Sequence, residues 1–282
     1  MIRDIAGRQN HSVKLARKLL KKKHRRERGL LVCEGMDLLV AAVEAEAQIR
    51  EVLARSDLVA ELPRDLLELA SSERPPDAAV SGTVLDIGVC DRETLEYASA
   101  LGGAVDVIFM CAEPLWSLDD VAMAEGATLF LDGVGDPGNV GTVIRSAVAF
   151  GLAGVICSPG TADPFGPKAM RAGMGAQFSV PVVTEVSVSD LKARLAAAAG
   201  RKESVPELWV ADPHEGEDIR AAQAAGGMVV VLGTERKGPS SEWSGCRRVS
   251  IPQHSLESIN VAMAGTIFAY ESYRLRSGSG GK

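Results

Sequence analysis

Three glycines with the spacing G-x-G-x-x-G indicate a place where the backbone could approach a bound ligand closely. Gly133, Gly135 and Gly138 follow an apolar run that is expected to form a strand, and they precede an expected helix. In dinucleotide-binding enzymes such a turn cradles a pyrophosphate, and an acidic residue about 20 positions further on holds the ribose. Residues 155–159 contain no acid, and Pro137 removes a backbone donor from the turn. A dinucleotide-dependent oxidoreductase is therefore kept only as a second rival interpretation.

Polar side chains in and after this stretch could orient a polar substrate. Arg145 lies in the expected helix and Asn139 lies just ahead of it, whereas Glu235 follows a buried strand and a glycine. A guanidinium rarely gives up its proton, because its pKa lies above ~12. We therefore expect Arg145 to act as a fixed cation and hydrogen-bond donor rather than as a base. A surface ion pair of Arg145 and turn capping by Glu235 are the structural alternatives.

Three ordered motifs resemble those of the TrmH/SpoU family of RNA ribose 2′-O-methyltransferases, which belongs to the SPOUT superfamily. Residues 131–147 match the pattern L-D-x-x-x-D-P-x-N-x-G-x-x-x-R-(S/T)-A throughout. Residues 232–238 match L-G-x-E-x-x-G. The third motif, I-P-M followed by S-L-N-V, is similar to residues 251–253 and 258–261. Together the motifs extend over residues 128–275.

The resemblance implies S-adenosylmethionine as the cofactor and assigns roles to residues of this chain. The catalytic residues that it implies are Arg145, Asn139, Glu235, Ser258 and Asn260. The cofactor-binding residues that it implies are Leu232, Gly233, Thr234, Ile251, Gln253 and Ile259. Ser258 and Asn260 precede the last helix and either could be only an N-cap, and Ile251 and Ile259 could be simple core residues. The resemblance also implies a trefoil knot around the cofactor and a homodimer with its active site at the subunit interface.

The sequence departs from the family pattern at several positions. Thr234 stands where Asn is usual, Arg236 where a small or acidic residue is usual, Gln253 where Met is usual, and Ile259 where Leu is usual. The loop between residues 251 and 260 is one residue shorter. These departures motivate the main rival, an RNA-binding relative without catalytic activity, and the retained catalytic residues argue against it.

The motifs are placed by an alternation of apolar strands and helices that predicts a mostly parallel sheet covered on both faces. Strands are expected at residues 128–132, 154–158, 208–211, 228–232 and 248–251. Helices are expected at residues 141–150, 168–173, 188–199, 218–225 and 258–274. The predicted fold class is therefore α/β, with a C-terminal SPOUT domain preceded by a small L30e-like α/β domain.

The first half shows the alternation of strands and helices that is expected of a smaller α/β domain. Strands are expected at residues 29–35, where the strand ends in a turn, and at 49–53, 80–84 and 105–111, and helices at residues 36–47, 62–70 and 92–100. Residues 10–19, 25–28 and 34–35 resemble the L30e-like RNA-binding domain that is often fused ahead of this catalytic domain. The usual Pro-Gln-Gly near its end is replaced by residues 101–104. The predicted domains are residues 1–112 and 127–275, with a linker at 113–126 and a disordered tail at 276–282.

Charge is distributed unevenly along the chain. The net charge is −6, but residues 1–28 contain eleven Lys or Arg against two acids, a local charge of +9. Helical spacing places most of these cations on one face of a predicted amphipathic helix, which suggests contact with a polyanion. A solvated face is the alternative. The expected RNA-binding residues are Lys14, Arg17, Lys18, Lys21, Lys22, Arg25 and Arg26, together with Lys168 and Arg171, which lie one helical turn apart.

Other features narrow the class of protein. The five cysteines are scattered and form no C-x-x-C pair, so we expect neither a disulfide framework nor a cysteine zinc site, and a cytoplasmic location. His214 lies near three acids but without metal-ligand spacing, so no metal is expected. No apolar run reaches the roughly 18–20 residues of a membrane span, so no membrane partner is expected. The sequence thus predicts S-adenosylmethionine-dependent ribose 2′-O-methylation of structured RNA. The expected partner is 23S rRNA, with tRNA as the alternative.

Overall fold

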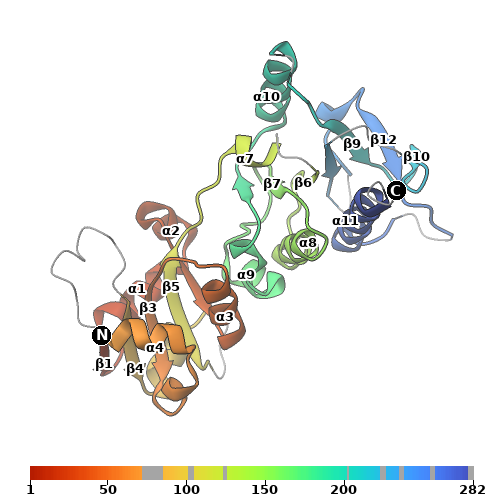
Figure 1. Ribbon diagram of the computed structural model, residues 1–282. Coiled ribbons are helices and arrows are strands. Elements are labelled where there is room, and N and C mark those ends of the chain that lie inside the picture. The colour runs from red at the N-terminus through yellow and green to blue at the C-terminus, as the bar shows by residue number, and fades with distance from the viewer. Residues whose placement is uncertain are drawn as a thin grey trace. The chain divides into compact units, whose positions relative to one another are not determined.

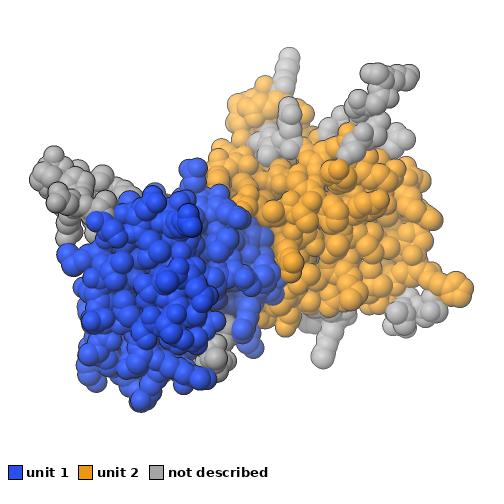
Figure 2. All heavy atoms as spheres, turned by 60° about the horizontal axis from the view of Figure 1, so that its bottom comes forward, with its two compact units in different colours: residues 1–114, 165–178 blue, residues 115–164, 179–282 orange. Residues whose placement is uncertain are grey.

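The computed structural model describes residues 1–71, 85–100, 105–122, 126–201, 203–222, 227–234, 238–254 and 258–278. The chain forms two compact units, each with its own sheet. The first unit comprises Met1–Pro114 and Phe165–Phe178, and the second comprises Leu115–Pro164 and Ser179–Lys282 (Figure 2). The segment Phe165–Phe178 was not expected in the first unit, since it comes from the middle of the second half of the sequence.

The sheet of the first unit has five strands in the order β1-β4-β3-β5-β2 (Figure 1). Its strands are β1 (Ile2–Ile5), β2 (Leu30–Glu34), β3 (Ile49–Arg55), β4 (Asp86–Cys90) and β5 (Val107–Ala112). β1, β4 and β3 pair in parallel, whereas β5 is antiparallel to both β3 and β2. β1 was not predicted, and the predicted strand at residues 80–84 lies outside the described residues.

Helices cover both faces of this sheet. α1 (His11–Leu19) and α6 (Arg92–Ala98) share one buried cluster with side chains of the central strands, among them Leu53 and Ile108. α3 (Met36–Glu44) and α9 (Pro167–Gly173) contact β2. The remaining elements are α2 (Lys22–Arg28), α4 (Arg64–Ser71), and the 3-10 turns η1 (Ser56–Glu61) and η2 (Ala176–Phe178). The ring centroids of Phe178 and Phe109 lie 6.4 Å apart. The segment Phe165–Phe178 therefore packs against the core of the first unit.

The sheet of the second unit has seven strands in the order β10-β12-β9-β11-β6-β7-β8, and every pair is parallel. The strands are β6 (Ala127–Leu131), β7 (Gly154–Cys157), β8 (Val182–Thr184), β9 (Glu207–Ala211), β10 (Glu217–Asp218), β11 (Met228–Leu232) and β12 (Arg247–Ser250). The predicted parallel sheet is confirmed, and the short strands β8 and β10 are additional.

Helices cover both faces of this second sheet as well. α8 (Pro137–Ala149) and α11 (Val261–Gly278) pack against each other. They approach closely at Gly265, where an added Cβ would lie 3.0 Å from both Leu232 and Val143. On the opposite face, α7 (Leu118–Ala122), α10 (Val188–Gly200) and the 3-10 turn η3 (Ser241–Trp243) supply the side chains that pack around Phe130. The strands read as continuous apolar runs because both of their faces are covered.

The expected basic helix at the N-terminal end is two helices instead of one. α1 ends at Leu19 and α2 begins at Lys22, so the basic side chains do not form one continuous face. Arg25 was expected in solvent, and this is wrong: it is 3% exposed, and its guanidinium donates to the carbonyl oxygens of Leu19 and Leu20 at 2.9 and 3.1 Å. The buried guanidinium thereby satisfies carbonyl groups that α1 leaves unpaired at its end.

Two further predicted elements are wrong. The helix predicted at residues 218–225 does not begin at residue 218: β10 ends at Asp218 and residues 219–221 form a turn, because the Asp218 carboxylate accepts from the backbone N–H of Arg220 while β10 pairs with β12. Residues 223–225 lie outside the described residues. The expected disordered tail is helical at its start, since α11 extends to Gly278, and residues 279–282 lie outside the described residues. Among the described helices, none is both long and apolar enough to span a bilayer.

Candidate active site

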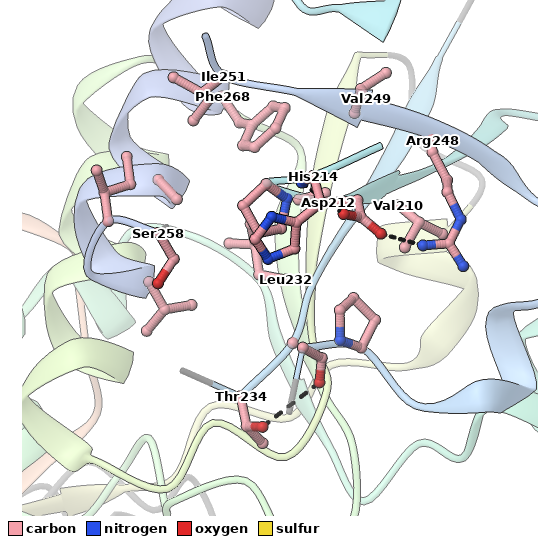
Figure 3. A pocket seen from close by; sticks show the side chains of 18 of the residues that line it. Val210, Asp212, His214, Leu232, Thr234, Arg248, Val249, Ile251, Ser258 and Phe268 are labelled. Carbon is pink, nitrogen blue, oxygen red and sulfur yellow. Dashed lines mark hydrogen bonds and ion pairs between the residues drawn. The ribbon is translucent and has the colours of Figure 1, made fainter. Parts of the chain in front are cut away.

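A cavity of about 380 Å³ lies at the carboxyl ends of β9, β11 and β12 (Figure 3). These ends meet because the three strands are parallel neighbours in the sheet, and open α/β sheets bind ligands at such an edge. The lining comes from the segments that follow the three strands and from α11, which contributes Val261, Ala264 and Phe268. Its volume lies in the range of roughly 300–1,000 Å³ that is typical of small-molecule sites.

The structure brings together all of the side chains that were predicted to bind a cofactor. Leu232, Gly233 and Thr234 line the cavity directly after β11. Ile251, Gln253 and Ile259 line it after β12, together with Ser258 from the predicted catalytic group. Motifs that are far apart in the sequence therefore converge on one pocket.

Gly233 is required by the close passage of the loop that follows β11. A Cβ at this position would lie 2.0 Å from the backbone nitrogen of Pro239 and 2.1 Å from the carbonyl carbon of Gly238. Thr234 and Gly238 hold the ends of the loop together, since each backbone N–H donates to the other's carbonyl, at 3.2 and 2.9 Å. Glu235, a predicted catalytic residue, lies outside the described residues.

Asp132 anchors the far side of the same loop, a role that the sequence did not indicate. Its Oδ2 accepts from the backbone N–H of Ser240 at 2.8 Å and from the indole Nε1 of Trp243 at 2.9 Å. Because Asp132 directly follows β6, these bonds tie the loop after β11 to the neighbouring strand. The pocket wall formed by Pro239, Ser240 and Trp243 is therefore fixed in position.

Gln253 has an unpaired acceptor. Its Oε1 is buried and has no hydrogen-bond partner in the described part of the chain, although the residue lines the pocket. A buried acceptor left without a donor costs about 1–3 kcal/mol. A ligand that carries an N–H donor would remove this cost, so the pocket fits a small molecule with an amino group.

A further wall of the pocket follows β9 and was missed from the sequence. Asp212, Pro213 and His214 all line the cavity. Burial alone would raise the pKa of Asp212. Hydrogen bonds from the backbone N–H groups of His214 and Glu215, together with the Arg248 guanidinium, have the larger opposite effect, so the pKa of Asp212 lies below its ordinary value. Figure 3 shows Asp212 joined to Arg248, which also lines the pocket. The negative charge of the Asp212 carboxylate is therefore neutralised by Arg248. Separately, no cluster of His, Cys, Asp or Glu that could hold a metal ion occurs among the described residues.

Asn139 and Asn260 connect the first motif to the third. Asp136 caps α8 by accepting from the backbone N–H of Asn139 at 2.9 Å, with Pro137 in the first turn, where it needs no donor. Asn260 accepts from the backbone N–H groups of Ala262 and Met263 at the start of α11. Its amide nitrogen then donates to the Oδ1 of Asn139 at 3.1 Å. Two predicted catalytic residues therefore form a direct contact.

Arg145 lies apart from the pocket of its own chain. Its side chain is exposed on α8, and no hydrogen bond or ion pair joins it to another residue in the described part of the chain. It is not among the residues that line the cavity. The structure thus brings Ser258 and the residues that were predicted to bind the cofactor together in one pocket, and it joins Asn139 to Asn260, neither of which lines that pocket. It leaves Arg145 exposed on α8.

Comparison with known proteins gives these features a context. Residues 126–270, which include the pocket, α8 and most of α11, match the SpoU rRNA Methylase family. The chain belongs to the SpoU rRNA methylase family. Residues 10–86 match the MRM3-like substrate binding domain.

SpoU relatives match the chain over nearly its whole length. The 23S rRNA (guanosine(2553)-2′-O)-methyltransferase of Bacillus subtilis is 28% identical, over 95% of this chain and 98% of that protein. The 23S rRNA (uridine(2479)-2′-O)-methyltransferase of Streptomyces viridochromogenes is also 28% identical, over 92% of this chain and 88% of that protein. The crystal structure of the SpoU methyltransferase AviRb from Streptomyces viridochromogenes, in complex with AdoMet, matches with a TM-score of 0.80 and 26% identity, over 97% of this chain and 100% of that chain.

Most of the predicted RNA-binding cations of this SpoU protein are open to solvent. Lys14, Arg17, Lys18, Lys21 and Arg26 are exposed in or beside α1 and α2, and Lys22 is half-buried. Lys168 and Arg171 are exposed on α9. Arg25 is the exception, because its charge is buried under the end of α1.

Proposed function

We propose that this chain transfers the methyl group of S-adenosylmethionine to the 2′-hydroxyl of a ribose in 23S rRNA. The observation that carries the proposal is the single pocket lined by Leu232, Gly233, Thr234, Ile251, Gln253 and Ile259. Membership of the SpoU family supports methyl transfer. The names of the full-length relatives support 23S rRNA as the substrate, and the AdoMet-bound structure of AviRb supports the cofactor.

The residues of the pocket fit S-adenosylmethionine. Leu232, Ile251 and Phe268 offer apolar surface to a flat base, and the unpaired Oε1 of Gln253 offers an acceptor to an amino group. The cofactor supplies a methyl group already activated by a positively charged sulfur. The departures from the family pattern at Thr234, Gln253 and Ile259 do not close the cavity, which argues against an inactive relative.

The protein has to position a ribose hydroxyl and stabilise the charge that develops on its oxygen. Arg145 suits the second task, because a guanidinium stays protonated and presents several donors to a phosphate or an alkoxide. The Asn139–Asn260 contact fixes the start of α8, the helix that carries Arg145, against the start of α11. In this account Asn139 and Asn260 orient the catalytic groups, and Glu235 and Ser258 complete the site.

We also propose that the chain forms a homodimer with a knotted catalytic domain, as its resemblance to SPOUT proteins implies. The exposed position of Arg145 supports an active site completed by the second copy. Large apolar side chains are exposed on the same two helices: Val148 on α8, and Met263, Tyr270 and Tyr273 on α11. Mixing inactive Arg145→Ala and Gly233→Ala variants should restore part of the activity if each copy supplies one half of a site.

A cytoplasmic location is proposed as well, since thiols such as those of Cys33 and Cys246 are free.

Calorimetric titration of the purified protein with S-adenosylmethionine, and separately with NAD, tests the proposal. We expect saturable binding of S-adenosylmethionine at about one site per chain or fewer, and no signal with NAD. Absence of S-adenosylmethionine binding, with bulk RNA present as well as without it, would contradict the proposal and favour an inactive RNA-binding relative. Binding of NAD would instead favour the oxidoreductase interpretation.

A further inference from the structure

A tyrosine and two arginines form a stacked cluster on the surface of the first unit. The guanidinium carbon of Arg17 lies 4.3 Å from the centroid of the Tyr97 ring, and that of Arg8 lies 5.0 Å from it. Arg17 belongs to α1 and Tyr97 to α6, and Arg8 precedes α1 in the chain. Both arginines are exposed and Tyr97 is half-buried. Flat cationic groups are therefore presented to solvent against an aromatic support.

The cluster is held in place by contacts beneath it. Tyr97 packs against the buried cluster that includes Val13 of α1 and Leu95 of α6. Arg17 donates a hydrogen bond to the carbonyl oxygen of Tyr97, and Arg8 pairs with the Glu93 carboxylate at 2.5 Å. Groups that are already fixed lose little conformational entropy when a ligand binds, so the arrangement favours recognition of a flat ligand.

Positive charge without an internal partner surrounds this cluster. Glu93 compensates Arg8, but in the described part of the chain no carboxylate pairs with Lys14, Arg17, Lys18 or Lys21. Lys14 and Lys18 lie in α1 on either side of Arg17, and all are exposed. Uncompensated cations beside a stacking surface fit a single-stranded polyanion with flat bases better than they fit an acidic peptide.

We propose that an unpaired base of the RNA stacks on the Arg17 guanidinium, which the Tyr97 ring supports, while neighbouring phosphates contact Lys14, Lys18 and Lys21. This inference rests on the proposed function, because it assumes an RNA substrate, and it adds which part of the RNA the first unit recognises. A base within a duplex is already stacked on both faces and is not available to the cluster. The site therefore selects an unpaired nucleotide in a loop, bulge or single strand.

Fluorescence anisotropy of the full chain with two labelled RNA probes tests the proposal. One probe is an adenosine pentanucleotide, and the other is a pentanucleotide of the same backbone whose central three positions lack bases. Both carry equal charge, so only stacking distinguishes them. We expect the wild-type chain to bind the first probe on the order of 10-fold more tightly, the scale of one stacked base.

Substitutions separate stacking from charge. Arg17→Lys keeps the positive charge but loses the flat guanidinium, so the preference for bases should disappear while the salt dependence of binding stays unchanged. Lys18→Gln is the matched control at the neighbouring position: it should weaken binding of both probes equally and reduce the salt slope. Equal binding of the two probes by the wild-type chain, or a preference that survives Arg17→Lys, would overturn the inference. Titration with S-adenosylmethionine, whose pocket none of these variants touches, shows separately whether the proposed function fails.

Discussion

The side-chain amide of Asn260 donates to the Oδ1 of Asn139 across 3.1 Å, and the same Asn260 side chain caps the last helix. One residue therefore stabilises α11 and links it to α8, the helix that carries Arg145. The two roles use different atoms, since the cap uses Oδ1 and the link uses Nδ2. They can be separated by substitution.

Asn260→Asp is predicted to keep the cap and lose the link. Aspartate caps helices about as well as asparagine, so the free energy of unfolding in urea should stay within about 0.5 kcal/mol of wild type. Methyl transfer should fall strongly, because no amide remains to donate to Asn139. Asn260→Ala should in addition lower the free energy of unfolding by about 1 kcal/mol, the usual value of an N-cap. An Asn260→Asp variant with full activity would show that the contact has no role in catalysis.

Arg145→Ala is predicted to abolish methyl transfer and leave the rest of the protein unchanged. Arg145 is exposed and has no described partner, so its removal should alter the free energy of unfolding by less than about 0.5 kcal/mol. Calorimetry should find the wild-type affinity for S-adenosylmethionine, since the residue does not line the pocket. Loss of cofactor binding in this variant would mean that Arg145 belongs to the cofactor side of the site.

Gln253→Met is predicted to have opposite effects on stability and on binding. Replacing a buried acceptor that lacks a donor should raise the free energy of unfolding of the cofactor-free protein by about 1 kcal/mol. The Kd for S-adenosylmethionine should rise on the order of 10-fold, because the amino group of the cofactor loses its acceptor. Thermal unfolding with and without cofactor measures both effects. An unchanged Kd would show that Gln253 does not contact the ligand.

Gly233→Ala is predicted to distort the pocket, because its Cβ would collide with the backbone of Gly238 and Pro239. A backbone shift of this loop should weaken S-adenosylmethionine binding at least 10-fold as measured by calorimetry. Gly135→Ala is the matched control, since nothing lies within 4 Å of a Cβ at that position. If Gly233→Ala binds the cofactor as tightly as wild type does, the cavity after β11 is not the cofactor site.

The fold of the second unit could be predicted largely because of its regular pattern. Apolar runs alternate with helices, so the parallel sheet and most of its strands were predicted to within a few residues. The failures have local causes that periodicity does not reveal. Arg25 fits the charge pattern of an exposed face, yet its guanidinium is buried under the carbonyls at the end of α1. Residues 218–222 have helical composition, yet strand pairing holds Asp218 in β10 and its side chain stabilises a turn at residues 219–221.

The site was predictable where the family motifs name residues, and less so elsewhere. The six residues that were predicted to bind the cofactor line one pocket. His214 and the acids near it, which include Asp212, were considered only as poor metal ligands, although their position directly after β9 was a signal for the ligand edge of a parallel sheet. Asp132 also directly follows a strand of this sheet and belongs to the first motif, but its anchoring role could not be predicted, because its hydrogen bonds to Ser240 and Trp243 join residues more than a hundred positions apart.

Transfer of labelled methyl groups to RNA tests whether the chain methylates a ribose hydroxyl. The chain would be incubated with methyl-labelled S-adenosylmethionine and 23S rRNA lacking 2′-O-methyl groups, and the product would be hydrolysed with alkali. A ribose that carries a 2′-O-methyl group blocks cleavage of the adjacent phosphodiester, so we expect label in alkali-resistant dinucleotides with the wild-type chain and none with Arg145→Ala. Label released entirely as mononucleotides would indicate methylation of a base, and it would contradict the assignment of ribose as the methyl acceptor.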